Sequence, residues 1–352
     1  MEKSLGSQRE VHYDILRILA AFSVVMLHSA AQYWYALDIH SKDWIVANSY
    51  DAVFRFGVPI FVMISGALFL SPDYKMDIKR LYQRNILRMA ILYMLWSVLY
   101  GVYDVITNGY YNYGVKVILR ELIYGRYHLW FLPMIIGVYM LLPMLKTWIE
   151  HADKKQIEYI LSLFLVFQIG VWTAKSLTVT DELHYILAKL DIELVSSYIG
   201  YFIWGYYLAN IGLSDKLKKL FYILMIPSVI LNVFLGTTMA WKYDRAIGEV
   251  YDSFGIFTFI IVTVLFVFAK DKWSKGTDYK GWDRLIKEMS ANTLGVYLMH
   301  IMLLEFLERC GIHSMMINNV VGIPLLAVGC FIICMIVSAL LRRVPFIGRY
   351  IC

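Results

Sequence analysis

Charged residues are scarce in this chain of 352 residues, because Asp, Glu, Lys and Arg together make up only 17% of it. Soluble domains carry about 25% charged residues, which they need to cover a surface that faces water. The chain also lacks long polar or low-complexity stretches, and loops of about 20 residues are too short to bury a core of their own. The composition therefore excludes a soluble globular fold, and we expect residues 1–352 to form a single transmembrane domain.

Cysteine is also rare, and all four cysteines lie near the C-terminus. Their spacing fits neither a disulfide framework nor a metal site, so we predict no metal. Cys330 and Cys334 lie inside an apolar run and are expected to be packing residues. The polar N-terminus shows no short apolar region followed by a cleavage site, so the first apolar run is expected to be retained.

Apolar residues make up 60% of the chain and fall into long runs. A helix of about 20 residues crosses roughly 30 Å of hydrocarbon, and lipid offers the backbone no hydrogen-bond partners. The runs are too long and too uniformly apolar for the strands of a barrel. We predict an all-α polytopic membrane protein with about ten transmembrane helices, at residues 13–35, 53–70, 84–106, 129–149, 157–174, 196–212, 219–236, 253–270, 291–308 and 320–341.

Positive charge predicts the orientation of these spans. With the N-terminus inside, the inner segments hold 21 of the 33 Lys and Arg residues and the outer loops hold nine. Because cytoplasmic loops retain Lys and Arg, this asymmetry predicts that both ends of the chain are cytoplasmic. The same distribution explains the net charge of +6 without a nucleic-acid partner.

Two polar residues in the first span form the clearest candidate site. Arg17 and His28 are 11 positions apart, which is about 20° past three full turns, so both project from one helix face about 16 Å apart. An ionisable residue inside a span is costly and is a functional candidate by default. Alternatively, Arg17 extends to the headgroups and His28 satisfies a backbone carbonyl; the shared face favours the functional interpretation.

The third span begins with Arg80, Arg84 and Arg88, at the spacing that places three residues along one stripe of an α-helix. Guanidinium groups hold phosphate oxygens through two parallel hydrogen bonds, so the stripe suits a phosphate-rich ligand. Arg80 and Arg84 are also what the positive-inside rule alone predicts, whereas Arg88 lies one turn deeper.

Further polar residues lie at the start of the fourth span and within the ninth. His128 and Trp130 are candidates for substrate binding or members of an aromatic belt at the membrane surface. His300, with Glu305 about one and a half turns further along, indicates either a structural pair or a polar cavity. In the second span, Gly57-Val58-Pro59 and Ser65-Gly66 predict a distorted helix or close packing against a neighbour.

Five motifs occur in a characteristic order: Asp14-x-x-Arg17 followed by His28, the Gly57–Gly66 stretch, the basic start of span three, Tyr127-His128-Leu129-Trp130-Phe131-Leu132, and Thr293-Leu294-Gly295-Val296-Tyr297-Leu298-Met299-His300. Together they resemble the acyltransferase-3 family, membrane enzymes that O-acylate bacterial cell-surface carbohydrates. Many members have a closer arginine pair than Arg84 and Arg88, which leaves the match between these arginines open.

The resemblance implies an acyl-CoA donor, usually acetyl-CoA, and an acceptor hydroxyl on a lipid-linked or cell-surface sugar, in the inner or plasma membrane. It implies that Arg80, Arg84 and Arg88 hold the donor phosphates and that Arg17 positions the donor. On this resemblance we expect His28 to act as general base, since the pKa of an ordinary histidine lies near neutral pH; a transient acyl-histidine is a variant of this mechanism. His128, Trp130, His300 and Glu305 then surround the acceptor.

A transporter or flippase for a lipid-linked or anionic solute is the alternative, since ten spans with internal charges also suit a carrier. No inverted repeat is evident, and span two holds the single clear cluster of helix-breaking residues. The enzyme is the interpretation that the motifs favour.

Overall fold

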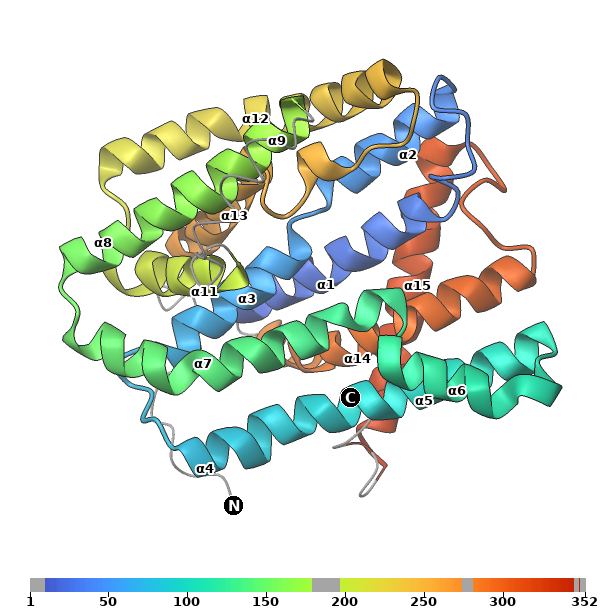
Figure 1. The fold of residues 1–352 in the computed structure, drawn as a ribbon, viewed down its shortest axis with the longest axis horizontal. Helices are drawn as coiled ribbons and strands as arrows, with labels where there is room; N and C mark the ends of the chain where they lie inside the picture. The colour runs from blue at the N-terminus through green and yellow to red at the C-terminus, as the bar shows by residue number, and fades with distance from the viewer. Residues whose placement is uncertain (1–9, 179–196, 274–280, 345–347, 349–352) are drawn as a thin grey trace. The chain divides into compact units, whose positions relative to one another are not determined.

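The computed structural model describes residues 10–178, 197–273, 281–344 and 348. Over these residues the chain is helical without strands, and nine helices are long and apolar enough to cross a membrane (Figure 1). The predicted all-α, polytopic membrane fold is therefore confirmed, while the orientation of the two ends stays a prediction. Some residues used in predicting charge and packing lie outside the described residues: Lys3, Arg9, Lys189, Lys275, Lys280, Arg349 and Cys352.

The predicted span at 196–212 is not among the nine. Its described part is an α-helix, α11 (Tyr198–Tyr206), that continues into a π-helical segment, η5 (Tyr207–Ile211). Every α11 side chain from Ile199 onward is buried. This helix is thus surrounded by protein, and its described length is below that of the other candidate spans.

The chain packs as two units, and two of the three boundaries between them along the sequence lie inside helices. Unit 1 comprises residues 1–75 and 146–290, and unit 2 comprises residues 76–145 and 291–352. Helices α7 (Phe131–His151) and α14 (Asp283–Arg309) each begin in one unit and end in the other.

Unit 1 is built around the first helix, α1 (Val11–Ala31), which packs against α2, α3 and α13. Serine hydroxyls cap several of its helices: Ser41 accepts the backbone N–H of Trp44, and Ser214 accepts that of Leu217. The other elements of unit 1 are α2 (Lys42–Val53), α3 (Gly57–Phe69), α8 (Lys154–Leu163), η4 (Phe164–Gly170), α9 (Val171–Thr178), α12 (Asp215–Tyr243), η6 (Glu249–Tyr251) and α13 (Ile256–Trp273).

Glycines permit a close contact between two helices of unit 1. A Cβ atom at Gly66 of α3 would lie 1.8 Å from the carbonyl oxygen of Phe202, and one at Gly205 of α11 would lie 2.0 Å from that of Met63. The two helices therefore touch backbone to backbone, as small residues permit in membrane proteins. The close packing that the Ser65-Gly66 pair predicts is confirmed.

Unit 2 contains a helix that the sequence did not predict. Helix α6 (Gly114–Tyr124) lies in a predicted outer loop and packs against α5 (Leu87–Asn108). The contact is close at Gly101, where a Cβ atom would lie 2.9 Å from the Cα of Ile118. The remaining elements of unit 2 are α4 (Ile78–Arg80), η1 (Leu81–Ile86), η2 (Tyr111–Tyr113), η3 (Tyr127–Trp130) and α15 (Asn319–Leu341).

Candidate functional site

In unit 1, the guanidinium of Arg17 is held by a buried carboxylate. Arg17 Nη1 lies 3.1 Å from Asp14 Oδ1, one turn earlier on α1, and the hydroxyl of Ser290 donates to the same oxygen at 2.5 Å. The Asp14 side chain is 9% exposed, whereas that of Arg17 is 31% exposed. A guanidinium carries five N–H donors, so the ion pair fixes one edge of the group while the rest of it can meet a ligand.

His28 lies on the same continuous helix, as predicted, and its ring is held by the helix itself. Its Nδ1 lies 2.9 Å from the carbonyl oxygen of Val24. A carbonyl only accepts hydrogen bonds, so Nδ1 carries the hydrogen and the basic lone pair of the neutral ring resides on Nε2. The contact to a backbone carbonyl that the structural alternative predicted is present, and it leaves Nε2 as the nitrogen with the basic lone pair.

The arginine stripe of the third span differs from the prediction. A π-helical segment, η1, separates Arg80 from Arg88 and contains Arg84, so the stripe does not follow a regular α-helix. The hydrogen bonds of a π-helix run from residue i to i+5 and widen the turn, which changes the angle between side chains. Arg80 and Arg84 are exposed and Arg88 is half-buried. Such segments occur frequently at functional sites.

In unit 2, the predicted residues His128 and His300 come together although they belong to different helical segments. Their ring centroids are 5.1 Å apart at an interplanar angle of 81°, and both side chains are buried. The Nδ1 of His300 lies 2.7 Å from the carbonyl oxygen of Tyr297, which places its hydrogen there and its lone pair on Nε2. The hydroxyl of Tyr297 donates in turn to the carbonyl oxygen of His128.

Tyr100 connects α5 to α14 beside this histidine pair. Its hydroxyl donates to the carbonyl oxygen of Leu298 at 3.0 Å, accepts the N–H of Met302 at 3.1 Å, and lies 3.5 Å from His128 Nε2. Trp130, also predicted to bind substrate, has a 44% exposed side chain. The buried polar centre of unit 2 is thus formed by two histidines and two tyrosines.

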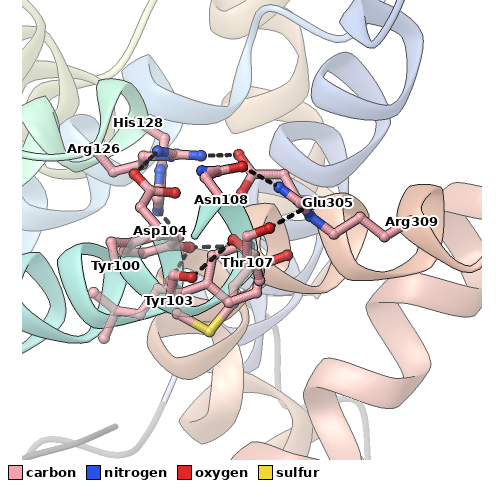
Figure 2. A network of polar contacts seen from close by, with 11 residues as sticks. Tyr100, Tyr103, Asp104, Thr107, Asn108, Arg126, His128, Glu305 and Arg309 are labelled. Carbon is pink, nitrogen blue, oxygen red and sulfur yellow. Dashed lines mark hydrogen bonds and ion pairs between the residues drawn. The ribbon is translucent and has the colours of Figure 1, made fainter. Parts of the chain in front are cut away.

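A charged cluster adjoins this centre. Arg126 lies between two carboxylates, 2.9 Å from Asp104 of α5 and in an ion pair with Glu305 of α14 (Figure 2). Its guanidinium also stacks over the Tyr100 ring at 5.6 Å. Glu305 and Arg126 line a cleft together with Asp104, and the binding of a substrate by Glu305 stays a prediction. Arg309 donates to the carbonyl oxygen of Thr107 and to the side chain of Asn108.

The sequence did not single out Arg126, Asp104 or Tyr100, and Tyr297 was noted only as a member of the motif from Thr293 to His300. Asp104 was detectable, because it is an acidic residue inside the predicted span 84–106 and such residues are functional candidates by default. Arg126 was counted as an ordinary loop cation. Tyr100 gave no signal in a chain with 27 tyrosines.

A family model for acyltransferases, described as an acyltransferase domain, matches residues 11–341, which is nearly the whole chain. No curated protein and no solved structure matches the chain.

Proposed function

From the premise that this chain belongs to the acyltransferase-3 family, we propose that it transfers an acyl group, most simply acetyl, from cytoplasmic acyl-CoA to a hydroxyl of a cell-surface or lipid-linked carbohydrate. The family and the helices that can cross a membrane make it a multi-pass membrane acyltransferase. The donor, the acceptor, the plasma or inner membrane as its location and the roles of individual residues are parts of the proposal.

The tautomer of His28 is the observation that carries this proposal. With Nδ1 donating to Val24, Nε2 is the atom that accepts a proton. Nε2 removes the proton from the acceptor hydroxyl as its oxygen attacks the thioester carbonyl carbon. The tetrahedral intermediate collapses, the C–S bond breaks, and the imidazolium returns its proton to the departing thiolate. The products are the carbohydrate ester and free CoA, and His28 is neutral again.

Arginines suit the donor, because CoA carries its phosphates at the end opposite the thioester. Arg80, Arg84 and Arg88 hold these phosphates in the proposal, and the exposure of the first two agrees with contact to a soluble ligand. Arg17 positions the donor from α1, where Asp14 fixes one edge of its guanidinium. His128, Trp130, His300 and Glu305 contribute to acceptor binding.

The test is the release of free CoA from acetyl-CoA by the purified protein in nanodiscs, with and without a sugar acceptor. His28→Ala is expected to lower the rate by about 10²- to 10⁴-fold, the usual contribution of a general base. Arg17→Ala should lower it as well.

His151→Ala is the matched control, because its Nδ1 makes the same contact to the carbonyl four residues earlier, at 2.8 Å from Thr147, on an exposed helix end. The His151→Ala variant should release CoA from acetyl-CoA at the same rate as the wild type. A wild-type protein that neither binds nor consumes acyl-CoA would overturn the donor assignment, and transport of a lipid-linked solute would then be the reaction to measure.

A further inference from the structure

Unit 2 contains an apolar groove of about 300 Å³ formed by α5, α14 and α15. Apolar and aromatic side chains line it, including Trp96, Met299, Leu303, Phe306 and Val337. A groove of this composition suits a hydrocarbon chain and offers few partners to polar atoms.

A charged cleft of about 380 Å³ is formed by residues of the same unit. Its walls carry the carboxylates and guanidinium groups described above, contributed by Asp104, Asn108, Arg126, Glu305, Glu308 and Arg309. Three carboxylates outnumber two guanidinium groups, so the cleft carries net negative charge. Carboxylates accept hydrogen bonds and guanidinium groups donate them, and a sugar hydroxyl does both.

The groove and the cleft lie side by side along two helices. On α5, Tyr103 lines the groove and the next residue, Asp104, lines the cleft; on α14, Phe306 lines the groove and Glu305 the cleft. Consecutive residues of a helix project about 100° apart, so each of the two helices has one face that lines the groove and a neighbouring face that lines the cleft. The combination is an amphipathic site with an apolar part and a polar part.

We propose that this site binds the acceptor in lipid-linked form, with its hydrocarbon tail in the groove and its hydroxylated sugar headgroup in the cleft. This inference rests on the proposed function, since it identifies the acceptor of that reaction as a glycolipid. The net negative charge of the cleft disfavours an anionic headgroup. The pairing of donors and acceptors favours a sugar over a headgroup without hydroxyls.

The first test is photolabelling of the wild-type protein in nanodiscs by dodecyl β-D-glucopyranoside that carries a diazirine in its chain. Mass spectrometry should map the label to α5, α14 and α15. Excess dodecyl β-D-glucopyranoside should reduce the labelling about tenfold, while dodecyl phosphocholine and dodecyl sulfate should not. Equal competition by all three, or label spread over other lipid-facing helices, would show an ordinary bilayer lipid in the groove and overturn the inference.

Two substitutions on α15 make a matched pair. Val337→Trp places an indole in the groove, whereas Ile336→Trp adds the same bulk at the neighbouring position, which is 55% exposed and outside the groove lining. Val337→Trp should reduce glucoside labelling about tenfold, and Ile336→Trp should leave it unchanged. Equal labelling of the two variants would contradict the site.

The labelling needs no acyl-CoA, which separates the two proposals. A protein that is labelled specifically but never turns over acetyl-CoA would contradict the proposed function alone. A protein that turns over acetyl-CoA without glucoside-specific labelling would contradict the glycolipid site alone.

Discussion

The carboxylate of Glu305 forms an ion pair with Arg126, which lies 179 residues earlier in the chain. The same guanidinium binds Asp104 on α5 at 2.9 Å, so one side chain connects two helices through two carboxylates. Arg126 itself follows Gly125, whose φ of +69° turns the chain sharply after α6. The position of this arginine thus depends on a loop, a left-handed glycine and two helices together.

Replacing Arg126 by Gln should destabilise the protein, because the carboxylates of Asp104 and Glu305 would then face each other without a cation. Removing one partner from a buried pair costs about 3–5 kcal/mol, and partial exposure of these side chains reduces our expectation to roughly half of that. Thermal unfolding in detergent measures the change. Adding Asp104→Asn to Arg126→Gln should recover part of the loss.

Lys218→Gln serves as the control for this ion-pair experiment. Lys218 pairs with Asp271 at 2.9 Å, and both side chains are substantially exposed. Exposed pairs contribute about 0–1 kcal/mol, so this variant should melt close to the wild type. If Arg126→Gln melts like Lys218→Gln, the Arg126 cluster does not stabilise unit 2.

Gly66→Ala should destabilise unit 1, since the new Cβ would lie 1.8 Å from the carbonyl oxygen of Phe202. That contact is with backbone, so α3 and α11 must separate, and overpacking of this kind costs about 1–3 kcal/mol or more. Gly329→Ala on α15 is the matched control, because no atom lies within 4 Å of the position that its methyl group would take. It should leave stability unchanged or raise it by up to about 1 kcal/mol. Equal melting of both variants would refute the glycine contact.

Long apolar runs were enough to predict the membrane fold, and Ser65 and Gly66 indicated close packing as one of two alternatives, because both signals depend on local composition. The same approach missed α6, since its apolar residues share a short helix with Lys116, Arg120 and Glu121 and give no long run. It also assumed regular α-helical spacing through Arg84, where the structure has a π-helical segment. The choice between i+4 and i+5 hydrogen bonds depends on packing that spacing alone does not contain.

In the candidate site too, the features that depend on local sequence were predicted and those that depend on tertiary packing were not. The shared helix of Arg17 and His28 follows from the ten residues between them, which are apolar except for Ser23, and α1 indeed runs through both. The partners of these residues come from elsewhere: Ser290 binds Asp14 from a position 276 residues away. The approach of His128 to His300 likewise joins distant segments. Contacts across the chain of this kind are set by the tertiary fold and leave no periodic signal in the sequence.

Lys146→Met should destabilise unit 1. Lys146 is a buried cation whose ammonium group donates hydrogen bonds to backbone carbonyl oxygens just after the end of α3. Its Nζ donates to the carbonyl oxygens of Leu70 at 3.3 Å and Ser71 at 2.7 Å, and pairs with Glu150 at 3.2 Å. Unpaired buried carbonyls cost about 1–3 kcal/mol, and the loss should appear as a lower melting temperature. Lys154→Met, with a side chain 62% exposed, should have little effect. A Lys146→Met protein as stable as Lys154→Met would show that other groups satisfy these carbonyls.

Asp14→Asn should weaken the binding of acetyl-CoA while leaving the proposed general base, His28, in place. Asp14 does not reach the reacting atoms in the proposal; it is a positioning residue that fixes Arg17 through a charge-assisted hydrogen bond at 3.1 Å. An amide keeps the shape but loses the charge, so the KM for acetyl-CoA should rise about tenfold, equivalent to about 1.4 kcal/mol, with a smaller change in kcat. Asp73→Asn, at an exposed position, should change neither constant.

The double variant decides whether Asp14 acts through Arg17. If it does, Asp14→Asn has nothing further to remove once Arg17 is Gln, and Asp14→Asn/Arg17→Gln should match Arg17→Gln alone in both kinetic constants. Additive losses would mean that Asp14 contributes independently, for example through its bond to Ser290 and the packing of α1. Ser290→Ala separates these cases further: a rise in KM would trace the effect to the orientation of the Asp14 carboxylate, whereas a lower melting temperature at constant KM would trace it to packing.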